Sequence, residues 1–254
     1  MPIVDCENIV KTYRQGEVTV NALRNVSLSI DNGEFVALAG PSGSGKTTLL
    51  NMIGSLDQAD SGKISVAGND FGHMSPSELA DLRLRKLGFV FQAYNLIPVL
   101  SAVENVEYVM LLQGVPPKER IERAKTILDD VGLEDKYDRR PAELSGGMRK
   151  RVGLARAIAS EPEVLLYDEP TTGLDPITAD MINDLIVRLN DKLKITSVAV
   201  THDMTSAYKI ADRVVMLYRG KVEFDGSPEE VRTTDNPVVR QFTTGSADGP
   251  IQVR

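Results

Sequence analysis

Residues 40–47 read Gly40-Pro41-Ser42-Gly43-Ser44-Gly45-Lys46-Thr47 and match the pattern G-x-x-x-x-G-K-[ST]. The apolar run Phe35 to Ala39 precedes them as a buried strand, and a helical pattern follows them. In that context the glycines let backbone N–H groups converge on phosphate oxygens, Lys46 reaches the β and γ phosphates, and the Thr47 hydroxyl can bind Mg²⁺. An ordinary glycine turn is the alternative, but the order of strand, loop and helix favours nucleotide binding.

The sequence predicts strands before this loop and alternating strands and helices after it. The first thirty residues contain short β segments, and the middle of the chain has helical spacing over residues 103–112 and 118–131. From Ser145 onwards helix, strand, helix and strand follow one another, and a hairpin over residues 214–224 comes after them. This alternation predicts an α/β fold whose largely parallel sheet is covered on both faces.

The composition is that of an ordinary globular chain, because 42% of the 254 residues are hydrophobic and 26% are charged. The net charge of −7 argues against a nucleic-acid partner held through its phosphates. Cys6 is the only cysteine, so an intrachain disulfide is excluded and we expect this residue to be buried in a strand. We expect neither a secretory signal nor a membrane span, because every apolar run is far shorter than the roughly 20 residues that a bilayer requires.

Two carboxylates, Asp168 and Glu169, follow the apolar run Val164 to Tyr167. At the end of such a strand Asp168 is expected near the Mg²⁺ that the phosphate loop helps to hold, and Glu169 is placed to polarise a water for attack on the γ phosphate. Alone, the motif would equally describe a strand before a solvated acidic turn. Together with the phosphate loop it indicates triphosphate hydrolysis.

The chain has two histidines in different settings. His202 follows the apolar segment Thr196 to Val200, where it could donate a hydrogen bond to a γ phosphate or to the attacking water. His73 lies in a loop before the helix start Ser75-Pro76-Ser77-Glu78, and we interpret it as a surface residue.

A second anion site is predicted where Leu144-Ser145-Gly146-Gly147-Met148 begins a helix. Ser145, Gly146 and Gly147 expose backbone donors at the positive end of that helix. The charges of Arg149-Lys150-Arg151 could form an anion patch, but a solvated face of the helix is the favoured interpretation.

In this order the motifs resemble those of the ATP-binding subunits of ABC transporters, over nearly the whole chain. The set comprises the phosphate loop Gly40 to Thr48, Gln92 after Phe89-Val90-Phe91, the signature Leu144 to Gly147, Asp168-Glu169, Gly173-Leu174-Asp175 and His202. The resemblance implies an α/β P-loop NTPase core of RecA type, with an N-terminal antiparallel β subdomain and an inserted α-helical subdomain. It assigns residues 1–235 to the ATP-binding domain, about 93–145 to the helical subdomain and 236–254 to a C-terminal tail.

The resemblance also accounts for two phosphate sites in one chain. In this family two subunits sandwich ATP head to tail, so the phosphate loop of one faces the Ser145 signature of the other, and an isolated monomer should hydrolyse ATP poorly. Tyr13 resembles the aromatic residue that stacks on adenine, with a packing tyrosine as the alternative. Gln92 resembles the residue that contacts Mg²⁺ and the attacking water while linking to the membrane subunit, and Asp175 the residue that reaches across the dimer.

The implied partners are a second copy of the chain, integral membrane permease subunits and, in one subfamily, a periplasmic lipid-binding subunit. The implied location is the cytoplasmic face of the inner membrane, where the chain would be peripheral through its permease. The first half, including Tyr94-Asn95-Leu96-Ile97-Pro98, looks like the lipoprotein-releasing (Lol) and macrolide-efflux (Mac) ATPases. The second half, including Gly147-Met148-Arg149-Lys150-Arg151, looks like the phospholipid-trafficking (Mla) ATPases.

We therefore expect lipid or lipid-linked cargo, with an ATPase of macrolide or peptide efflux and a regulatory ATPase of the cell-division type as alternatives. Residues 236–254 are too polar to build a core. We expect them either to be a flexible end or, by resemblance to the Mla ATPases, to dock on the neighbouring subunit through Val238, Val239 and Phe242.

Overall fold

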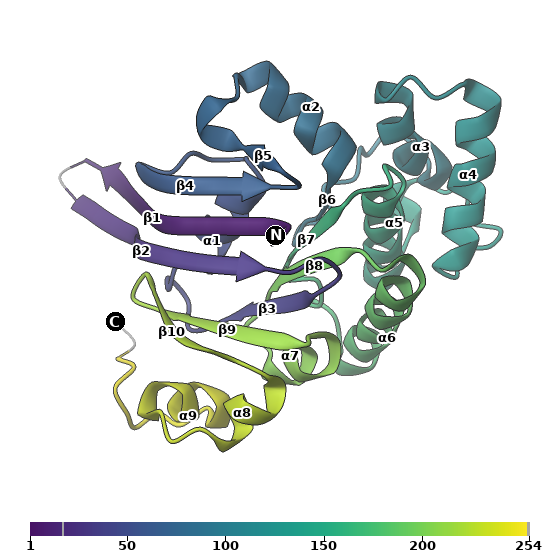
Figure 1. Cartoon of the computed structure of the whole chain (residues 1–254). Coiled ribbons are helices and arrows are strands. Elements are labelled where there is room, and N and C mark those ends of the chain that lie inside the picture. The colour runs from purple at the N-terminus through teal and green to yellow at the C-terminus, as the bar shows by residue number, and fades with distance from the viewer. Residues whose placement is uncertain (17, 253–254) are drawn as a thin grey trace. The chain divides into compact units, whose positions relative to one another are not determined.

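The computed structural model describes residues 1–16 and 18–252, and the chain divides into two compact units (Figure 1). The first unit comprises Met1–Met74 and Thr196–Arg254, and the second comprises Ser75–Ile195. Across the described residues, none of the helices combines the length and apolar character needed to cross a membrane.

An antiparallel sheet forms much of the first unit. Its strands are β1 (Val4–Gln15), β2 (Val18–Ile30), β4 (Ser61–Val66) and β5 (Asn69–Asp70), in the order β2-β1-β4-β5. Val26, Leu28 and Ile30 of β2 are buried and alternate with exposed residues, so one face of the strand packs inward. Cys6 is buried on β1 as predicted, and burial raises the pKa of its thiol to about 12.

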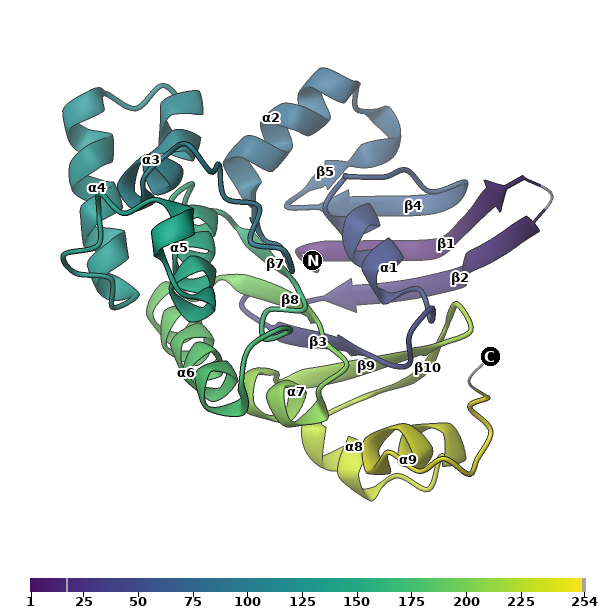
Figure 2. The same cartoon turned by 180° about the vertical axis from the view of Figure 1, so that it is seen from behind.

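Four further strands of the first unit lie side by side, and the phosphate loop follows one of them, β3 (Phe35–Ala39). The others are β8 (Thr196–Val200), β9 (Arg213–Tyr218) and β10 (Lys221–Gly226), and the order is β10-β9-β3-β8. Because β3 is paired in parallel with strands on both sides, every residue of it is buried and its sequence is apolar throughout. Helix α1 (Lys46–Ile53) contacts β2 and β4 as well as β8 (Figure 2).

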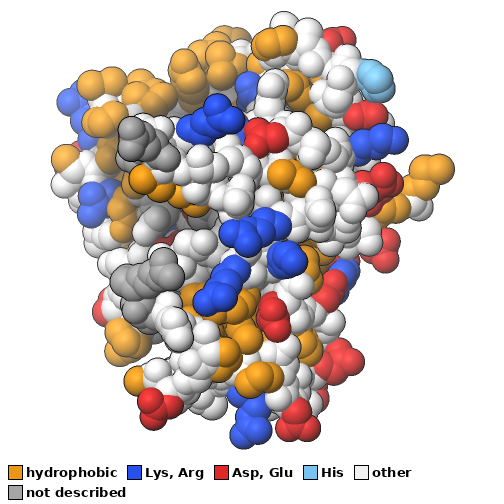
Figure 3. Space-filling model, turned by 90° about the vertical axis from the view of Figure 1, so that its left-hand side faces the viewer, with side chains coloured by type: hydrophobic (Ala, Val, Ile, Leu, Met, Phe, Trp, Pro, Cys, Tyr) orange, Lys and Arg blue, Asp and Glu red, His pale blue; other side chains and the backbone are white. Residues whose placement is uncertain are grey.

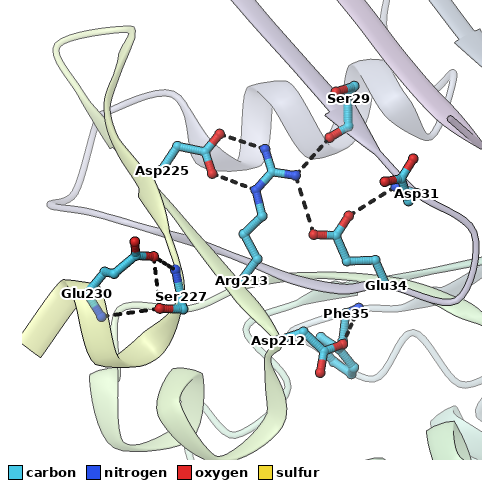
Figure 4. Close-up of polar contacts among 9 residues, drawn as sticks. All are labelled: Ser29, Asp31, Glu34, Phe35, Asp212, Arg213, Asp225, Ser227 and Glu230. Carbon is cyan, nitrogen blue, oxygen red and sulfur yellow. Dashed lines mark hydrogen bonds and ion pairs between the residues drawn. The ribbon is translucent and has the colours of Figure 1, made fainter.

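One arginine ties several strands of the first unit together (Figure 4). Arg213 of β9 donates two hydrogen bonds to the carboxylate of Asp225 on β10, at 2.5 and 2.6 Å. Its remaining nitrogen donates to the carbonyl of Ser29 at 3.1 Å and to Glu34 at 3.3 Å. The hydrogen bonds to Asp225 raise the pKa of Arg213, so the guanidinium stays charged. These contacts fix β9, which leads towards the phosphate loop, to β2 and to the start of β3.

The C-terminal residues form helices that the sequence did not predict. After α7 (Met204–Ile210) and β10 come α8 (Pro228–Thr233) and α9 (Pro237–Thr244). Val238 and Val239 of α9 are buried in a cluster with Ala37 of β3 and Val214 of β9, and Phe242 packs against this cluster. The expectation that residues 236–254 contribute no core is therefore wrong for α9, because a short helix places its apolar residues on one face.

The second unit has two strands and most of the helices. Strands β6 (Leu87–Val90) and β7 (Val164–Asp168) are parallel neighbours. The helices are α2 (Pro76–Lys86), α3 (Ala102–Leu112), α4 (Pro117–Asp130), α5 (Gly146–Ile158) and α6 (Pro176–Leu193). Capping boxes at Ser75 and Ser101 start α2 and α3. Each serine hydroxyl accepts a hydrogen bond from the backbone N–H three residues on, and the glutamate side chain at that position accepts one from the backbone N–H of the serine.

The mixed α/β class, with its antiparallel β subdomain and helical elements, is confirmed. His73 is an exposed residue, as expected, and lies 3.7 Å from Asp70.

Candidate nucleotide-binding site

The phosphate loop depends on three glycines that have different reasons to be glycine. Gly40, Gly43 and Gly45 all have positive φ angles, of 131°, 72° and 104°. A Cβ on Gly40 would lie 2.2 Å from the carbonyl oxygen of Leu217, and one on Gly45 would lie 2.5 Å from that of Ala22. A Cβ on Gly43 would meet nothing within 4 Å, so this part of the loop faces open space that a ligand can enter.

Buried polar groups of the loop point to an anion. Lys46 is buried, and its Nζ donates to the carbonyl oxygens of Gly40 at 2.8 Å and Pro41 at 2.9 Å. The Ser44 hydroxyl is buried and finds no hydrogen-bond partner among the described residues. Since buried hydroxyls are nearly always paired, this one fits a site that is completed by a phosphate. Apart from the loop, Figure 3 shows several lysine and arginine side chains close together on one face of the molecule, with acidic side chains around them.

Helix α1 begins directly at this loop. Its N-cap is Gly45, which supplies no side-chain hydrogen bond, and its first turn contains no acidic residue. The first N–H groups of the helix therefore remain suited to an anionic ligand. Thr47 is exposed in this turn and Thr48 is half-buried, while Ser42 is exposed in the loop.

Tyr13 lies near the same loop and is held by its neighbours. Its hydroxyl donates to Asp57 at 2.7 Å, and it also shares a hydrogen bond with Thr48. The Nζ of Lys11 lies 5.1 Å from the centre of the ring and donates to Asp57 at 2.9 Å. Burial, and next the bond to Asp57, raise the pKa of Tyr13. Tyr13 is 39% exposed, so its side chain is held by these bonds while part of it remains open for stacking.

His202 follows β8, the neighbour of β3. The backbone N–H of Thr201 donates to the carbonyl of Leu38 at 3.1 Å, so β8 ends beside the strand that enters the phosphate loop. His202 is exposed there. The first unit thus brings His202 to the sheet edge that carries the phosphate loop.

The second unit brings Gln92, Asp168 and Glu169 to one sheet edge. Val90 of β6 is paired with Tyr167 of β7, so both strands end side by side; Asp168 is the last residue of β7, and Gln92 lies just beyond Phe91, which follows β6. Glu169 has a positive φ of 48°, and its Oε2 accepts a hydrogen bond from Thr172 Oγ1 at 2.8 Å.

The signature residues begin α5. Ser145 is the N-cap, and its hydroxyl accepts from the N–H of Met148 at 3.3 Å. A Cβ on Gly146 would lie 3.3 Å from the hydroxyl of Tyr94, and one on Gly147 would lie 2.8 Å from Cγ2 of Thr178. The first turn of α5 contains no acidic residue. The glycines are therefore needed for close packing, and their N–H groups lie where an anion is favoured.

Asp175 has a structural task in its own chain. Its carboxylate accepts from the N–H groups of Ile177 and Thr178 and from the Thr178 hydroxyl, and so caps α6. The side-chain bond from Thr178, followed by the backbone bonds, lowers the pKa of Asp175. This capping would hold the carboxylate in one position at the surface.

The prediction of a solvated face for Arg149-Lys150-Arg151 is wrong for Lys150. This side chain is 0% exposed, and its Nζ donates to the carbonyls of Phe91 and Gln92, both at 3.2 Å. Arg151 donates to the carbonyl of Val131 at 3.2 Å. The charge run gave no sign of this burial, because the target is a set of backbone carbonyls in a distant loop. Lys11 and Asp57, which hold Tyr13, were missed because Asp57 is distant in sequence from both Lys11 and Tyr13.

Comparison with known proteins identifies the family. Residues 23–172 match the family model described as "ABC transporter". A lipoprotein-releasing system ATP-binding protein LolD from Coxiella burnetii is 43% identical over 87% of this chain and 95% of its own length. A macrolide export ATP-binding/permease protein MacB from Syntrophobacter fumaroxidans is 42% identical over 94% of this chain, which spans only 33% of that protein.

A solved structure agrees with this assignment. It is the dimeric, post-hydrolysis state of the ATP-binding cassette MJ0796 of Methanocaldococcus jannaschii, bound to ADP and Pi. The TM-score is 0.82 at 41% identity, with 89% of this chain and 98% of that chain covered. The chain therefore belongs to the ABC transporter family, as one of its ATP-binding, ATP-hydrolysing members.

Proposed function

We propose that two copies of this chain bind ATP and Mg²⁺ head to tail, hydrolyse the ATP, and thereby power a separate membrane permease that moves lipid or lipid-linked cargo. The single observation that carries the proposal is that one chain has two helix starts that are suited to an anion. One is the phosphate loop, where no described residue pairs with the Ser44 hydroxyl, and the other is the start of α5 at Ser145. Two sites that face each other across a dimer would enclose each ATP from both sides.

The donor set suits Mg²⁺. No three His, Cys, Asp or Glu side chains gather as a metal cluster in residues 1–16 and 18–252. Mg²⁺ bound with a nucleotide needs no such cluster, because phosphates and waters supply most of its ligands. Thr47, Gln92 and Asp168 would provide the hydroxyl, amide and carboxylate oxygens that this ion prefers. When bound, the ion would neutralise phosphate charge.

The residues of the chain then have distinct tasks. Tyr13 would stack on adenine, while Lys46 and the N–H groups of Gly40 to Thr48 would hold the phosphates. Glu169 would polarise the attacking water, and His202 would donate a hydrogen bond to the γ phosphate. Ser145, Gly146, Gly147 and Asp175 would act on the ATP held by the partner.

The partners follow from this arrangement. Closure of the ATP sandwich would supply the force that changes the permease, and hydrolysis would reopen it. The chain would lie at the cytoplasmic face of the inner membrane through that permease. Cargo specificity would then belong to the permease and, in the phospholipid case, to a periplasmic lipid-binding subunit.

Lipid-linked cargo is supported by the likeness to the lipoprotein-releasing protein and by the motifs of both halves. The equally high identity to a macrolide export protein supports the alternative, an efflux ATPase. An ATPase that regulates cell division remains the third possibility on motifs alone.

Turnover by the Glu169→Gln variant tests the hydrolytic role. We expect ATP binding to persist while kcat falls by about 100-fold or more, because the amide cannot take up the water's proton. Glu134→Gln, which changes an exposed glutamate of the same unit, is the matched control and should keep wild-type turnover. Near wild-type turnover in Glu169→Gln would refute this role.

The cargo class is tested by isolating tagged Glu169→Gln from its native membranes with ATP and Mg²⁺ and identifying the co-purified membrane chain by mass spectrometry. A permease with a large extracytoplasmic domain would support lipoprotein release or efflux. A compact permease with a periplasmic lipid-binding subunit would support phospholipid traffic. A membrane chain without any transport pathway would refute cargo movement.

A further inference from the structure

A buried ammonium group lies beneath the signature. Lys150 of α5 is 0% exposed, although a lysine ordinarily keeps its charged end in water. Its Nζ donates to the carbonyls of Phe91 and Gln92 and lies 4.9 Å from the ring centre of Tyr94. Burial lowers the pKa of Lys150 to about 8, although Asp168 and Glu169 act in the opposite direction. Burying such a group is costly, so its partners need an explanation.

Those partners belong to one short segment, residues 91–95, which we call the glutamine loop. Arg156, further along α5, donates to the carbonyl of Asn95 at 2.6 Å and to that of Tyr94 at 3.1 Å. Tyr94 and Asn95 both have positive φ angles, of 62° and 46°. Two cations of a single helix thus hold four carbonyls of this loop in an unusual backbone conformation.

The same loop packs against the first turn of α5. The hydroxyl of Tyr94 lies at Gly146, where an added Cβ would be only 3.3 Å away. The Arg149 guanidinium lies 5.1 Å from the Tyr94 ring centre, so the ring is placed between charges of the helix and its signature glycine. The signature turn and the glutamine loop therefore form one packed body within the second unit.

We propose that Lys150 is a positioning residue that fixes the main chain of Gln92 to the signature helix, so that the groups acting on the two ATP molecules of a dimer move together. The proposal rests on the proposed function. In the head-to-tail dimer, Gln92 serves the ATP on the phosphate loop of its own chain, whereas Ser145 serves the ATP of the partner. A shift of α5 at one nucleotide is transmitted through Lys150 to Gln92 at the other.

The test compares three variants of the full chain. Lys150→Met keeps the approximate length of the side chain but removes its charge and its hydrogen-bond donors. Lys150→Arg keeps the charge and the donors. Lys118→Met, which changes an exposed lysine of α4, is the matched control. For each we would measure kcat and KM for ATP with Mg²⁺, and hydrogen–deuterium exchange of the peptides covering residues 91–97 and 40–48.

We expect Lys150→Met to lower kcat by about ten-fold or more while KM changes by less than about two-fold, because the phosphate loop and Tyr13 are untouched. Exchange should rise in residues 91–97 and stay unchanged in residues 40–48. Lys150→Arg should recover kcat to within about three-fold of wild type, because the guanidinium can reach the same carbonyls. A purely structural role would not produce this separation of kcat from KM.

Wild-type kcat in Lys150→Met, or equal loss in the Met and Arg variants, would overturn the proposal. Should Lys150→Met fail to fold, Lys150→Gln retains a neutral donor and should show the same pattern in weaker form. A wild-type chain without turnover would refute the proposed function instead. The exchange measurement still decides the positioning role in that case, since unchanged exchange in residues 91–97 would contradict it.

Discussion

The phosphate loop and the signature turn, which we propose both bind anions at the start of a helix, are built differently by the chain. The phosphate loop is shaped by its backbone, since Gly40 and Gly45 press against carbonyls of β9 and β2. The signature turn is held by side chains, since Tyr94 packs on it and Lys150 ties its helix to the glutamine loop. A sequence motif predicts the first kind of site well, because the spacing of its glycines determines the shape of the loop. It predicts the second kind only in part, because the supporting residues lie outside the motif.

The largest effect should come from Gly40→Ala in the phosphate loop. Gly40 has a φ of 131°, and the added Cβ would lie 2.2 Å from a backbone carbonyl oxygen. We therefore expect the free energy of unfolding to fall by more than about 3 kcal/mol and ATP binding to be lost. Gly43→Ala is the matched control, because it meets open space and should cost only about 1–2 kcal/mol for its positive φ. Urea denaturation measures both, and equal losses would mean that close packing does not shape this loop.

The same contrast separates the features that could be predicted from the sequence from those that could not. The strand, loop and helix around Gly40 to Thr48 were predictable because alternation and glycine spacing are local properties. The burial of Lys150 was not, because it depends on carbonyls of Phe91 and Gln92, about 58 residues away in sequence. Helix α9 was also missed, because its few apolar residues are buried in a cluster that residues of α8 and of the more distant β3, α7 and β9 complete.

Truncation after Asp235 tests whether helix α9 stabilises the strands around the phosphate loop. It removes Val238 and Val239 from the cluster that contains Met216 of β9, the strand whose Leu217 carbonyl touches Gly40. We expect the free energy of unfolding to fall by about 2–5 kcal/mol. Thermal unfolding of the shortened chain measures this. Truncation after Asp248 spares both valines, and an equal loss there would argue against their role.

Gly147→Ala probes the side-chain-built site. The new Cβ would lie 2.8 Å from Cγ2 of Thr178, so we expect a loss of about 1–3 kcal/mol in stability and a matching fall in turnover. Thr178→Ser removes that methyl group but keeps the hydroxyl that bonds to Asp175. The double variant should therefore recover most of the loss, which a double-mutant cycle measures. Additive losses would show that Thr178 is not the obstacle.

The smallest effect is expected at Tyr13, which the side chains of Asp57 and Thr48 hold near the phosphate loop. Asp57→Ala removes the acceptor that holds the Tyr13 hydroxyl, so the KM for ATP should rise by about two- to five-fold with little change in kcat. Tyr13→Phe removes the same hydrogen bond, so combining the two changes should add almost nothing. Steady-state kinetics of the three variants would show this, whereas independent, multiplying effects would contradict the shared bond.

In the proposed dimer, one ATP needs the phosphate loop of one copy and the signature of another. Lys46→Met disables the first element and Ser145→Arg the second, so each variant alone should be inactive. Mixed one to one, half of the dimers would pair one of each and restore one of their two sites, giving about a quarter of wild-type ATPase activity. Activity that never exceeds the sum of the separate variants would contradict the head-to-tail site.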